Sequence, residues 1–185
     1  MIDNLLKKIS SALDNNCVPY MIIGGQAVLL YGSPRFTRDI DITLGLNIDK
    51  FQTIKTLCSA LQIKITPENP EIFVKDTMVL PAEDTDSKIR VDFIFSFTPY
   101  EKNAISRAKE VMIGGYPVKF ASPEDVIVLK MFAGRAIDKE DVKNILLKQT
   151  KLDLKYIKKW LTVFQQIPEH KNILNNFEAI RKQAK

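Results

Sequence analysis

Several residue types are scarce in this chain of 185 residues, which has only 7 Gly, 2 Cys, 1 Trp and 1 His. Cys17 and Cys58 form no Cys-x-x-Cys pair and have no neighbouring histidine, which argues against a zinc site. We expect both to be buried thiols in a reducing compartment. The single histidine, His170, has no catalytic partner near it in the sequence and is expected at the surface.

Long apolar runs are also missing. No stretch reaches the roughly 18 apolar residues of a membrane span, and the first residues lack the apolar region of a signal peptide. We therefore expect a cytoplasmic protein. Its 45% hydrophobic and 26% charged residues are typical of a globular chain, either one domain or a domain with a small helical appendage.

The charge balance favours cations only moderately. The chain carries 27 Lys and Arg against 22 Asp and Glu, a net charge of +5 with a pI of about 9.1. This charge suits a polyanion such as a nucleotide or RNA, although many simple globular proteins are equally basic. A lysine run in the C-terminal part is typical of a solvated helix face, and a tRNA-modifying enzyme would use such a face. The run comprises Lys148, Lys151, Lys155, Lys158 and Lys159.

Hydropathy periods predict an α/β (α+β) arrangement up to residue 121, followed by a helical region over residues 122–185. We expect residues 1–121 to form the catalytic domain and the rest to pack on it. The first part has helices expected at 3–15, 26–31, 49–62 and 99–107, and strands at 19–23, 39–44, 63–66, 71–75 and 88–95. Acidic residues 83–86 indicate a turn, and Gly114-Gly115 indicates a hairpin of strands 109–113 and 116–120. Helices are expected at about 123–134, 138–148, 153–166 and 170–183.

Three carboxylates are the strongest candidates for chemistry. Asp39 and Asp41 are two apart on a predicted strand, so they project from one face and could hold hard cations by oxygen ligation. Taken alone, alternating aspartates would indicate only a solvated face. Asp92 interrupts the apolar run of residues 89–95 on the face opposite its apolar neighbours, which makes it the natural third ligand and general base.

A glycine turn precedes the acidic strand. Gly24-Gly25 closes the predicted strand 19–23 and leads into a helix, so backbone N–H groups of the turn can face a phosphate that approaches without meeting a Cβ. Arg35 and Arg38, in the loop before the aspartates, supply cations for phosphate oxygens or for solvent.

These pieces together resemble a known family. Residues 24–27 (Gly-Gly-Gln-Ala), 35–41 (Arg-Phe-Thr-Arg-Asp-Ile-Asp) and 90–92 (Arg-Val-Asp) resemble the nucleotidyltransferase superfamily, whose best-known member is DNA polymerase beta. Within it, the chain looks like the bacterial minimal and AbiE-type toxin branch. The resemblance extends from about residue 20 to about residue 147. It includes a downstream helical stretch with the same spacing of Lys130, Arg135, Asp138 and Asp141. Gln26 departs from the classical Gly-Ser pair, so a phosphate-binding hydroxyl is missing there, and Ser33 lies too far along the chain to replace it.

The resemblance implies a twisted mixed β-sheet with helices on one side and two Mg²⁺ ions, or Mn²⁺, held by three carboxylates. Asp39 and Asp41 would bind both ions, and Asp92 would bind the catalytic one and act as base or orient the attacking hydroxyl. Gly24 and Gly25 would contact the triphosphate. From the helical pattern alone, Lys130 points either at the nucleotide or at water, and Arg135, Asp138 and Asp141 are equally consistent with helix capping and ion pairing.

The implied reaction moves a nucleoside monophosphate from an NTP such as ATP to an acceptor hydroxyl and releases pyrophosphate. The AbiE-like resemblance favours tRNA or a protein as acceptor, with an antitoxin protein as partner. A small-molecule acceptor, as in aminoglycoside and lincosamide nucleotidyltransferases, is a second prediction. An inactive nucleotide-binding module is a third, against which the intact set of three aspartates argues.

Overall fold

The computed structural model describes residues 1–34, 36–96 and 98–184. Within these ranges the chain forms two compact units: unit 1 holds residues 1–26, 36–96 and 98–120, and unit 2 holds residues 27–34 and 121–184. No helix among the described residues combines the length and hydropathy needed to cross a bilayer.

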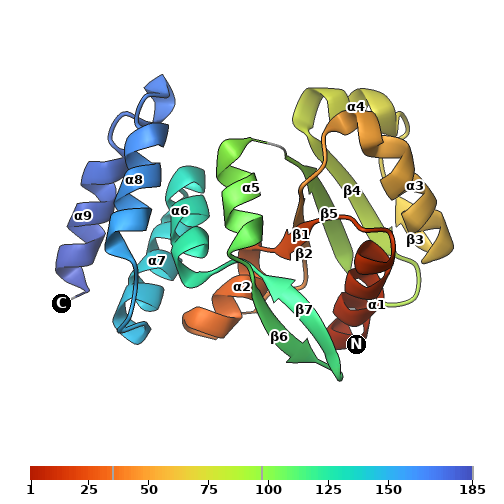
Figure 1. Ribbon diagram of the computed structural model, residues 1–185, viewed down its shortest axis with the longest axis horizontal. Coiled ribbons are helices and arrows are strands. Elements are labelled where there is room, and N and C mark those ends of the chain that lie inside the picture. Colours follow the sequence, from red (N-terminus) through yellow and green to blue (C-terminus); the bar gives the residue numbers. More distant parts are fainter. Residues whose placement is uncertain (35, 97, 185) are drawn as a thin grey trace. The chain divides into compact units, whose positions relative to one another are not determined.

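Unit 1 is built on a seven-stranded mixed sheet with the strand order β3-β4-β5-β2-β1-β7-β6 (Figure 1). β2 and β5 are parallel, as are β1 and β7, and the other neighbouring pairs are antiparallel. The strands are β1 (Tyr20–Ile22), β2 (Ile40–Leu44), β3 (Ile63–Ile65), β4 (Val79–Asp84), β5 (Arg90–Phe95), β6 (Lys109–Ile113) and β7 (Tyr116–Phe120). The predicted fold class and mixed sheet are confirmed.

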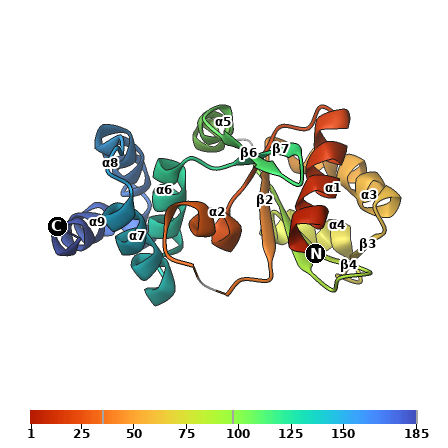
Figure 2. The same cartoon turned by 90° about the horizontal axis from the view of Figure 1, so that it is seen from below.

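The helices of unit 1 lie against this sheet, and Figure 2 gives a second view of them. They are α1 (Ile2–Asn15), the 3-10 turn η1 (Ile48–Lys50), α3 (Phe51–Ala60), α4 (Pro70–Thr77) and α5 (Pro99–Ser106). α1 buries one apolar stripe that includes Ile9 and Leu13. Its end is tied to β7 by Asp14, which pairs with Lys119 Nζ at 2.6 Å and accepts a hydrogen bond from Tyr116 at 2.9 Å. These contacts fix the N-terminal helix on the β6–β7 hairpin.

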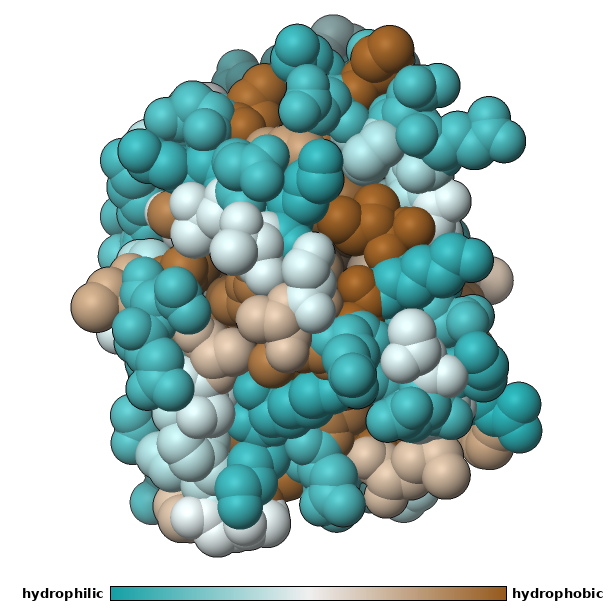
Figure 3. Space-filling model, turned by 90° about the vertical axis from the view of Figure 1, so that its right-hand side faces the viewer, coloured by the Kyte–Doolittle hydropathy of each residue, from teal (hydrophilic) through white to brown (hydrophobic). Residues whose placement is uncertain are grey.

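The strand predicted at 71–75 is wrong, because these residues belong to helix α4. Pro70 occupies its first turn, where a missing N–H costs nothing, and Glu71 suits the positive end of the helix dipole. Only Val74 is buried, while Ile72 is 62% exposed. Figure 3 shows apolar surface interspersed with hydrophilic side chains on the side of unit 1 where α4 lies.

The sequence pattern also missed β4. Glu83 and Asp84, predicted as part of a turn, end this strand, and the turn follows at residues 85–87. The Asp84 carboxylate accepts hydrogen bonds from the backbone and side chain of Ser87, at 2.8 and 2.6 Å, so it closes that turn. Asp84 therefore ends strand β4 and stabilises the turn that follows it.

Unit 2 is helical. It contains α6 (Pro123–Ala133), α7 (Ala136–Lys148), α8 (Leu154–Phe164), the 3-10 turn η2 (Pro168–His170) and α9 (Ile173–Gln183). α2 (Gly24–Tyr31) begins in unit 1 and ends in unit 2. There the carbonyl groups of Tyr31 and Gly32 accept hydrogen bonds from Gln149 and Lys148, both at 3.0 Å. These bonds satisfy carbonyls that the helix end would otherwise leave without partners.

The start of α6 follows the sequence signals closely. Ser122 is the N-cap residue, and its side-chain oxygen accepts a hydrogen bond from Asp125 N at 3.2 Å. The core of unit 2 is apolar and includes Ile127, Val142 and Leu161, each with 0% exposure. The last helix begins at Ile173 rather than at residue 170, because Pro168–His170 forms a separate 3-10 turn.

Candidate active site

Two of the three predicted carboxylates lie side by side on the sheet of unit 1. β2 and β5 are parallel neighbours, and their register pairs Asp41 with Asp92. Residues paired in this way project from the same face of a sheet. Asp39 lies just before β2, two residues from Asp41, and is exposed. The fold therefore brings the Asp92 strand next to the Asp39–Asp41 segment, although some fifty residues separate them in sequence.

Gly24 lies against the acidic strand. The backbone N–H of Ile23 donates to the Asp41 carbonyl at 2.9 Å, which joins the end of β1 to β2. Gly24 has a φ of +62°, and a Cβ placed on it would overlap the Asp41 carboxylate. Only glycine gives this backbone both the left-handed conformation and the space for that carboxylate. The start of α2 is thus in direct contact with a predicted site residue.

Gly25 faces the loop that precedes β2. A Cβ on Gly25 would overlap the side chain of Thr37, so the absence of a side chain lets loop and helix start meet closely. Gln26, which departs from the family pattern, donates from Nε2 to the Asp39 carbonyl at 3.3 Å. Gln26 therefore holds the backbone that carries Asp39, a role that the sequence pattern did not indicate.

Arg90 is a further site residue, which the motif at residues 90–92 contains but to which the sequence assigned no role. Its Nε lies 3.1 Å from Asp92 Oδ1, and its Nη2 lies 2.9 Å from Oδ2. Hydrogen bonding and charge from Asp92 raise the pKa of the Arg90 guanidinium, and the charges of Asp39 and Asp41 raise it further. One guanidinium thus interacts with all three carboxylates. The signal in the sequence was the spacing of two, which puts Arg90 and Asp92 on one strand face.

The donor set fits a hard divalent cation, because carboxylate oxygens are the ligands that Mg²⁺ prefers. Among residues 1–34, 36–96 and 98–184, however, no three His, Cys, Asp or Glu side chains stand close enough together to hold a metal ion. In the protein alone, Arg90 engages both oxygens of Asp92. The joint metal site of Asp39, Asp41 and Asp92 stays a prediction.

The predicted cationic residues fall into different surroundings. Arg38 is exposed, and its guanidinium carbon lies 4.7 Å from the centre of the Phe36 ring. Arg35 lies outside the described residues. Neither observation tests their predicted contact with phosphate.

Lys130 belongs to unit 2, where it forms a buried ion cluster. Its Nζ lies 2.8 Å from Asp138 Oδ1 and 2.9 Å from Asp141 Oδ2, and the lysine is only 6% exposed. Arg135 adds a bond from Nε to Asp138 Oδ2 at 2.7 Å. Burial raises the pKa of Asp138, but hydrogen bonds and charge from Arg135 and Lys130 outweigh it and lower the pKa overall. The ammonium group points at carboxylates, and its predicted contact with a nucleotide stays a prediction.

Comparison with known proteins identifies the family. A family model described as "Nucleotidyltransferase of unknown function (DUF6036)" matches residues 1–185. The chain belongs to this family. It is therefore a nucleotidyltransferase, and the predicted superfamily is confirmed, whereas membership of the AbiE-type branch stays a prediction. No curated protein matches the chain in sequence.

Solved structures support the same fold. One is an antigenic nucleotidyltransferase-like protein from Paracoccidioides brasiliensis, 14% identical, with a TM-score of 0.60 over 94% of this chain and 92% of that one. Another is ANT(2″)-Ia in complex with adenylyl-2″-tobramycin, 19% identical, with a TM-score of 0.53 over 99% of this chain and 98% of that one. At these identities the likeness concerns the fold alone.

Proposed function

We propose that this nucleotidyltransferase moves a nucleoside monophosphate from an NTP to an acceptor hydroxyl, with the reaction centred on Asp39, Asp41 and Asp92 of unit 1. The observation that carries the proposal is the pairing of Asp41 with Asp92 across the parallel strands β2 and β5, beside the Gly24 turn. A glycine turn and a helix start next to paired carboxylates suit a ligand that is both anionic and bound to divalent cations.

Each residue has a chemical role in this proposal. Asp39, Asp41 and Asp92 would hold Mg²⁺ or Mn²⁺, which would supply positive charge to the triphosphate and lower the pKa of the attacking hydroxyl. The backbone at Gly24 and Gly25 receives phosphate oxygens, and exposed Arg38 adds a cation for them. Arg90, which pairs with Asp92 on the same strand, adds a further cation at this edge of the sheet.

The bonds that change are few. The acceptor oxygen forms a bond to the α-phosphorus, the bond from that phosphorus to the bridging oxygen of the β-phosphate breaks, and pyrophosphate leaves with that oxygen. Asp92 accepts the proton of the acceptor hydroxyl, or orients that hydroxyl for attack. The protein contributes positioning and electrostatic stabilisation, as is usual for phosphoryl transfer.

The acceptor divides the proposal into two candidates. The AbiE-like motifs favour tRNA or a protein, with an antitoxin as partner. The alternative is a small molecule, favoured by the fold match over 99% of this chain to ANT(2″)-Ia, whose structure contains adenylyl-2″-tobramycin. Both candidates use the same carboxylates.

The test uses purified full-length chain with Mg²⁺ and α-labelled NTPs, offered total tRNA, a protein extract or aminoglycosides in parallel. Label is expected on one acceptor class, with release of pyrophosphate, and Asp41→Asn should abolish it. NTP with Mg²⁺ should also raise the melting temperature of the wild-type chain, whatever the acceptor. Absence of both NTP stabilisation and label transfer would contradict the proposed function.

A further inference from the structure

The positive charge of the chain is concentrated in its C-terminal part. Residues 121–185 contain 13 Lys and Arg against 8 Asp and Glu, whereas residues 1–120 contain 14 of each. The net charge of +5 therefore lies entirely in the segment that forms α6 to α9. A separate basic segment in a nucleotidyltransferase suits an extended polyanion better than a single nucleotide.

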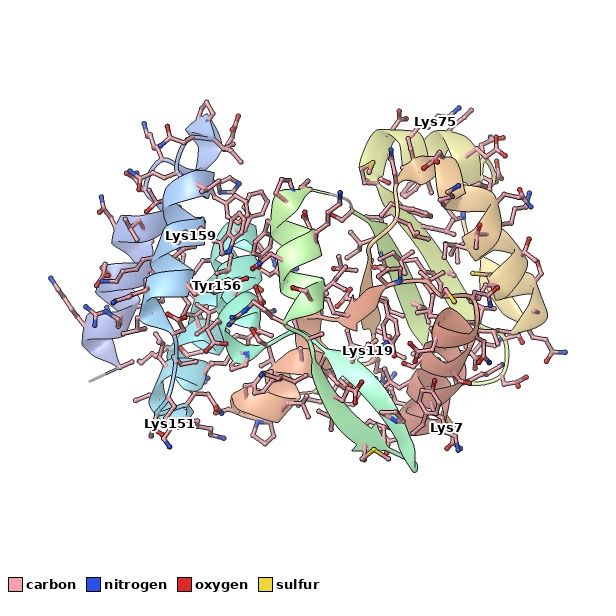
Figure 4. All side chains as sticks on the ribbon, viewed as in Figure 1. Lys7, Lys75, Lys119, Lys151, Tyr156 and Lys159 are labelled. Atoms are coloured by element: carbon pink, nitrogen blue, oxygen red, sulfur yellow. The ribbon has the colours of Figure 1, made fainter. Side chains whose placement is uncertain are left out.

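Not all lysines of the run at 148–159 are used in folding. Lys148 donates to the carbonyl of Gly32, and Lys158 pairs with Glu178 at 2.7 Å. The side chains of Lys151, Lys155 and Lys159 are exposed, and Figure 4 shows Lys151 and Lys159 spread along α8 and the loop before it. These three lysines define a basic edge of unit 2.

A row of aromatic rings runs beside this basic edge. Tyr156, Trp160 and Phe164 follow each other at every fourth position of α8, with ring centres 6.4 Å apart in both steps. The row continues from Phe164 to Phe132 at 5.0 Å, and from there to His170 at 4.1 Å. Lys159 Nζ lies 5.2 Å from the centre of the Trp160 ring, which is a cation–π contact between edge and row.

One ring of the row also supports the fold of unit 2, because the Tyr156 hydroxyl donates to Asp125 Oδ1 at 2.6 Å. α8 buries Ile157 and Leu161 completely, each one position after an aromatic residue. Tyr156, Trp160 and Phe164 are only partly buried, and Phe132 is 37% exposed. Aromatic rings that stay partly accessible beside lysines are features by which proteins bind single-stranded nucleic acids.

A hollow of about 230 Å³ opens at the Phe132–His170 end of the row. Asn172, Asn176 and Lys139 contribute polar groups to its lining, together with the acidic Glu169. Amide groups can donate to and accept from the edge of a base, so the hollow offers more than a plain apolar surface. Its volume is below the roughly 300 Å³ of the smallest drug-sized pockets, which leaves room for about one ring system.

We propose that unit 2 binds a single-stranded segment of RNA, with the phosphates on Lys151, Lys155 and Lys159 and the bases stacked on the aromatic row. The inference rests on the proposed function in that it names RNA as the acceptor class. It deepens that function by assigning acceptor binding to unit 2, whereas the NTP binds at the carboxylates of unit 1.

Trp160 is the only tryptophan of the chain, so its fluorescence reports on this surface directly. The full chain is titrated with a single-stranded oligoribonucleotide, an RNA duplex and inorganic polyphosphate, without NTP or divalent cations. We expect the single strand to quench Trp160 emission, because bases stack on the indole. Polyphosphate carries the charge without the bases and should change the emission much less than the single strand does, because it can act on Trp160 only through Lys159.

Two charge-reversal pairs separate specific binding from net charge. Lys155→Glu with Lys159→Glu should weaken binding of the labelled single strand about tenfold or more and reduce the dependence of binding on salt. The matched control, Lys64→Glu with Lys75→Glu, changes two exposed lysines of unit 1 by the same charge and should leave affinity within about twofold. Two single substitutions test the aromatic row: Trp160→Leu should lose affinity for the single strand, while Trp160→Phe should keep most of it. Melting temperatures are recorded for each variant.

The inference is overturned if Trp160 emission does not respond to single-stranded RNA. It is also overturned if polyphosphate competes with the labelled single strand as effectively as unlabelled single-stranded RNA does. It is likewise overturned if both lysine pairs weaken binding equally. NTP stabilisation is measured on the same variants to separate the two proposals. RNA binding without nucleotide transfer would contradict only the proposed function, and transfer to a non-RNA acceptor with silent Trp160 would contradict only this inference.

Discussion

Asp41 and Asp92 occupy paired positions on the parallel strands β2 and β5, and both side chains project from one face of the sheet. Two carboxylates so placed repel each other unless a cation lies between or beside them. Arg90 supplies that cation to Asp92 in the protein alone, through two hydrogen bonds. A divalent ion would supply more charge to the same place, which makes its binding measurable through stability.

We expect Mg²⁺ to raise the melting temperature of the wild-type chain and EDTA to reverse the increase. At a concentration of 100 times the dissociation constant, one bound ion contributes about 2.7 kcal/mol. Asp41→Asn and Asp92→Asn should lose most of this stabilisation and at least about 100-fold of the transfer rate, since each removes a charged ligand. Calorimetry of the three proteins with and without Mg²⁺ checks the binding.

The control for this series is Asp49→Asn, an exposed aspartate of the 3-10 turn η1 that is not among the predicted ligands. It should respond to Mg²⁺ as the wild type does. Equal Mg²⁺ stabilisation of Asp49→Asn and Asp41→Asn would contradict the metal site.

Gly24 and Gly115 both have positive φ, at +62° and +78°, but only Gly24 has a neighbour in the way of a Cβ. Gly115→Ala should destabilise by about 1 kcal/mol, from backbone strain alone. Gly24→Ala adds a collision with Asp41 and should cost about 1–3 kcal/mol more, with loss of Mg²⁺ and NTP stabilisation. Urea denaturation of the two variants measures the difference, and equal losses would show that Gly24 does not support the position of Asp41.

Local signals in the sequence predicted most elements well. The Gly114-Gly115 turn predicted the hairpin 109–113 and 116–120 with its exact bounds, because a two-residue turn fixes the register of both strands. The segment around α4 was predicted wrongly, since the apolar run Ile72 to Val74 has no clear period. β4 was missed because Pro81 and the acids after it are unusual in a strand paired on both sides.

The candidate site was predictable where chemistry depends on local spacing. The glycine pair predicted the turn at Gly24. The shared face of Asp39 and Asp41 stays a prediction, because β2 begins at Ile40 and does not include Asp39. The contacts of Gln26 with Asp39 and of Lys130 with Asp138 and Asp141 depend on how loops and helices pack, which no local pattern encodes. The contact of Arg90 with Asp92, by contrast, joins two residues on one strand face and follows from their spacing of two.

Lys130 lies between two carboxylates in a buried place, so removal of its charge should be costly. Lys130→Met leaves Asp138 and Asp141 with less compensation, and we expect a loss of about 3–5 kcal/mol in the free energy of unfolding. Lys139→Met, at an exposed position of the same helix as the aspartates, should change it by less than about 0.5 kcal/mol. If Lys130 also contacts nucleotide, Lys130→Arg should retain the fold but alter NTP stabilisation, which a thermal shift with and without NTP determines.

The same cluster predicts a dependence on pH. The pKa of Asp138 is lowered in the folded chain, so its contribution to stability is fully present above its unfolded pKa of about 4 and is lost as the pH falls through the folded value. The melting temperature of the wild type should therefore decrease when the pH is lowered below about 4. Asp138→Asn should be less stable at pH 7 and should lose less on acidification, as scanning calorimetry from pH 7 to 3 would show. A parallel decline of both proteins would assign the acid sensitivity to other groups.

Cys17 is exposed, whereas Cys58 is fully buried in α3, and burial raises the pKa of the Cys58 thiol to about 12. Because the thiolate is the reactive form, a thiol reagent should modify Cys17 rapidly in the native protein and Cys58 only after unfolding. The expectation of two buried thiols is thus wrong for Cys17, which has a φ of +53° in the turn after α1. Titration of native and denatured protein should give one and two reactive thiols, respectively, and Cys17→Ser should remove the thiol that reacts in the native protein.

Since Cys58 lies in unit 1, its labelling rate in urea measures the opening of that unit. A fast reaction of native Cys17→Ser protein would show that α3 does not protect the Cys58 thiol.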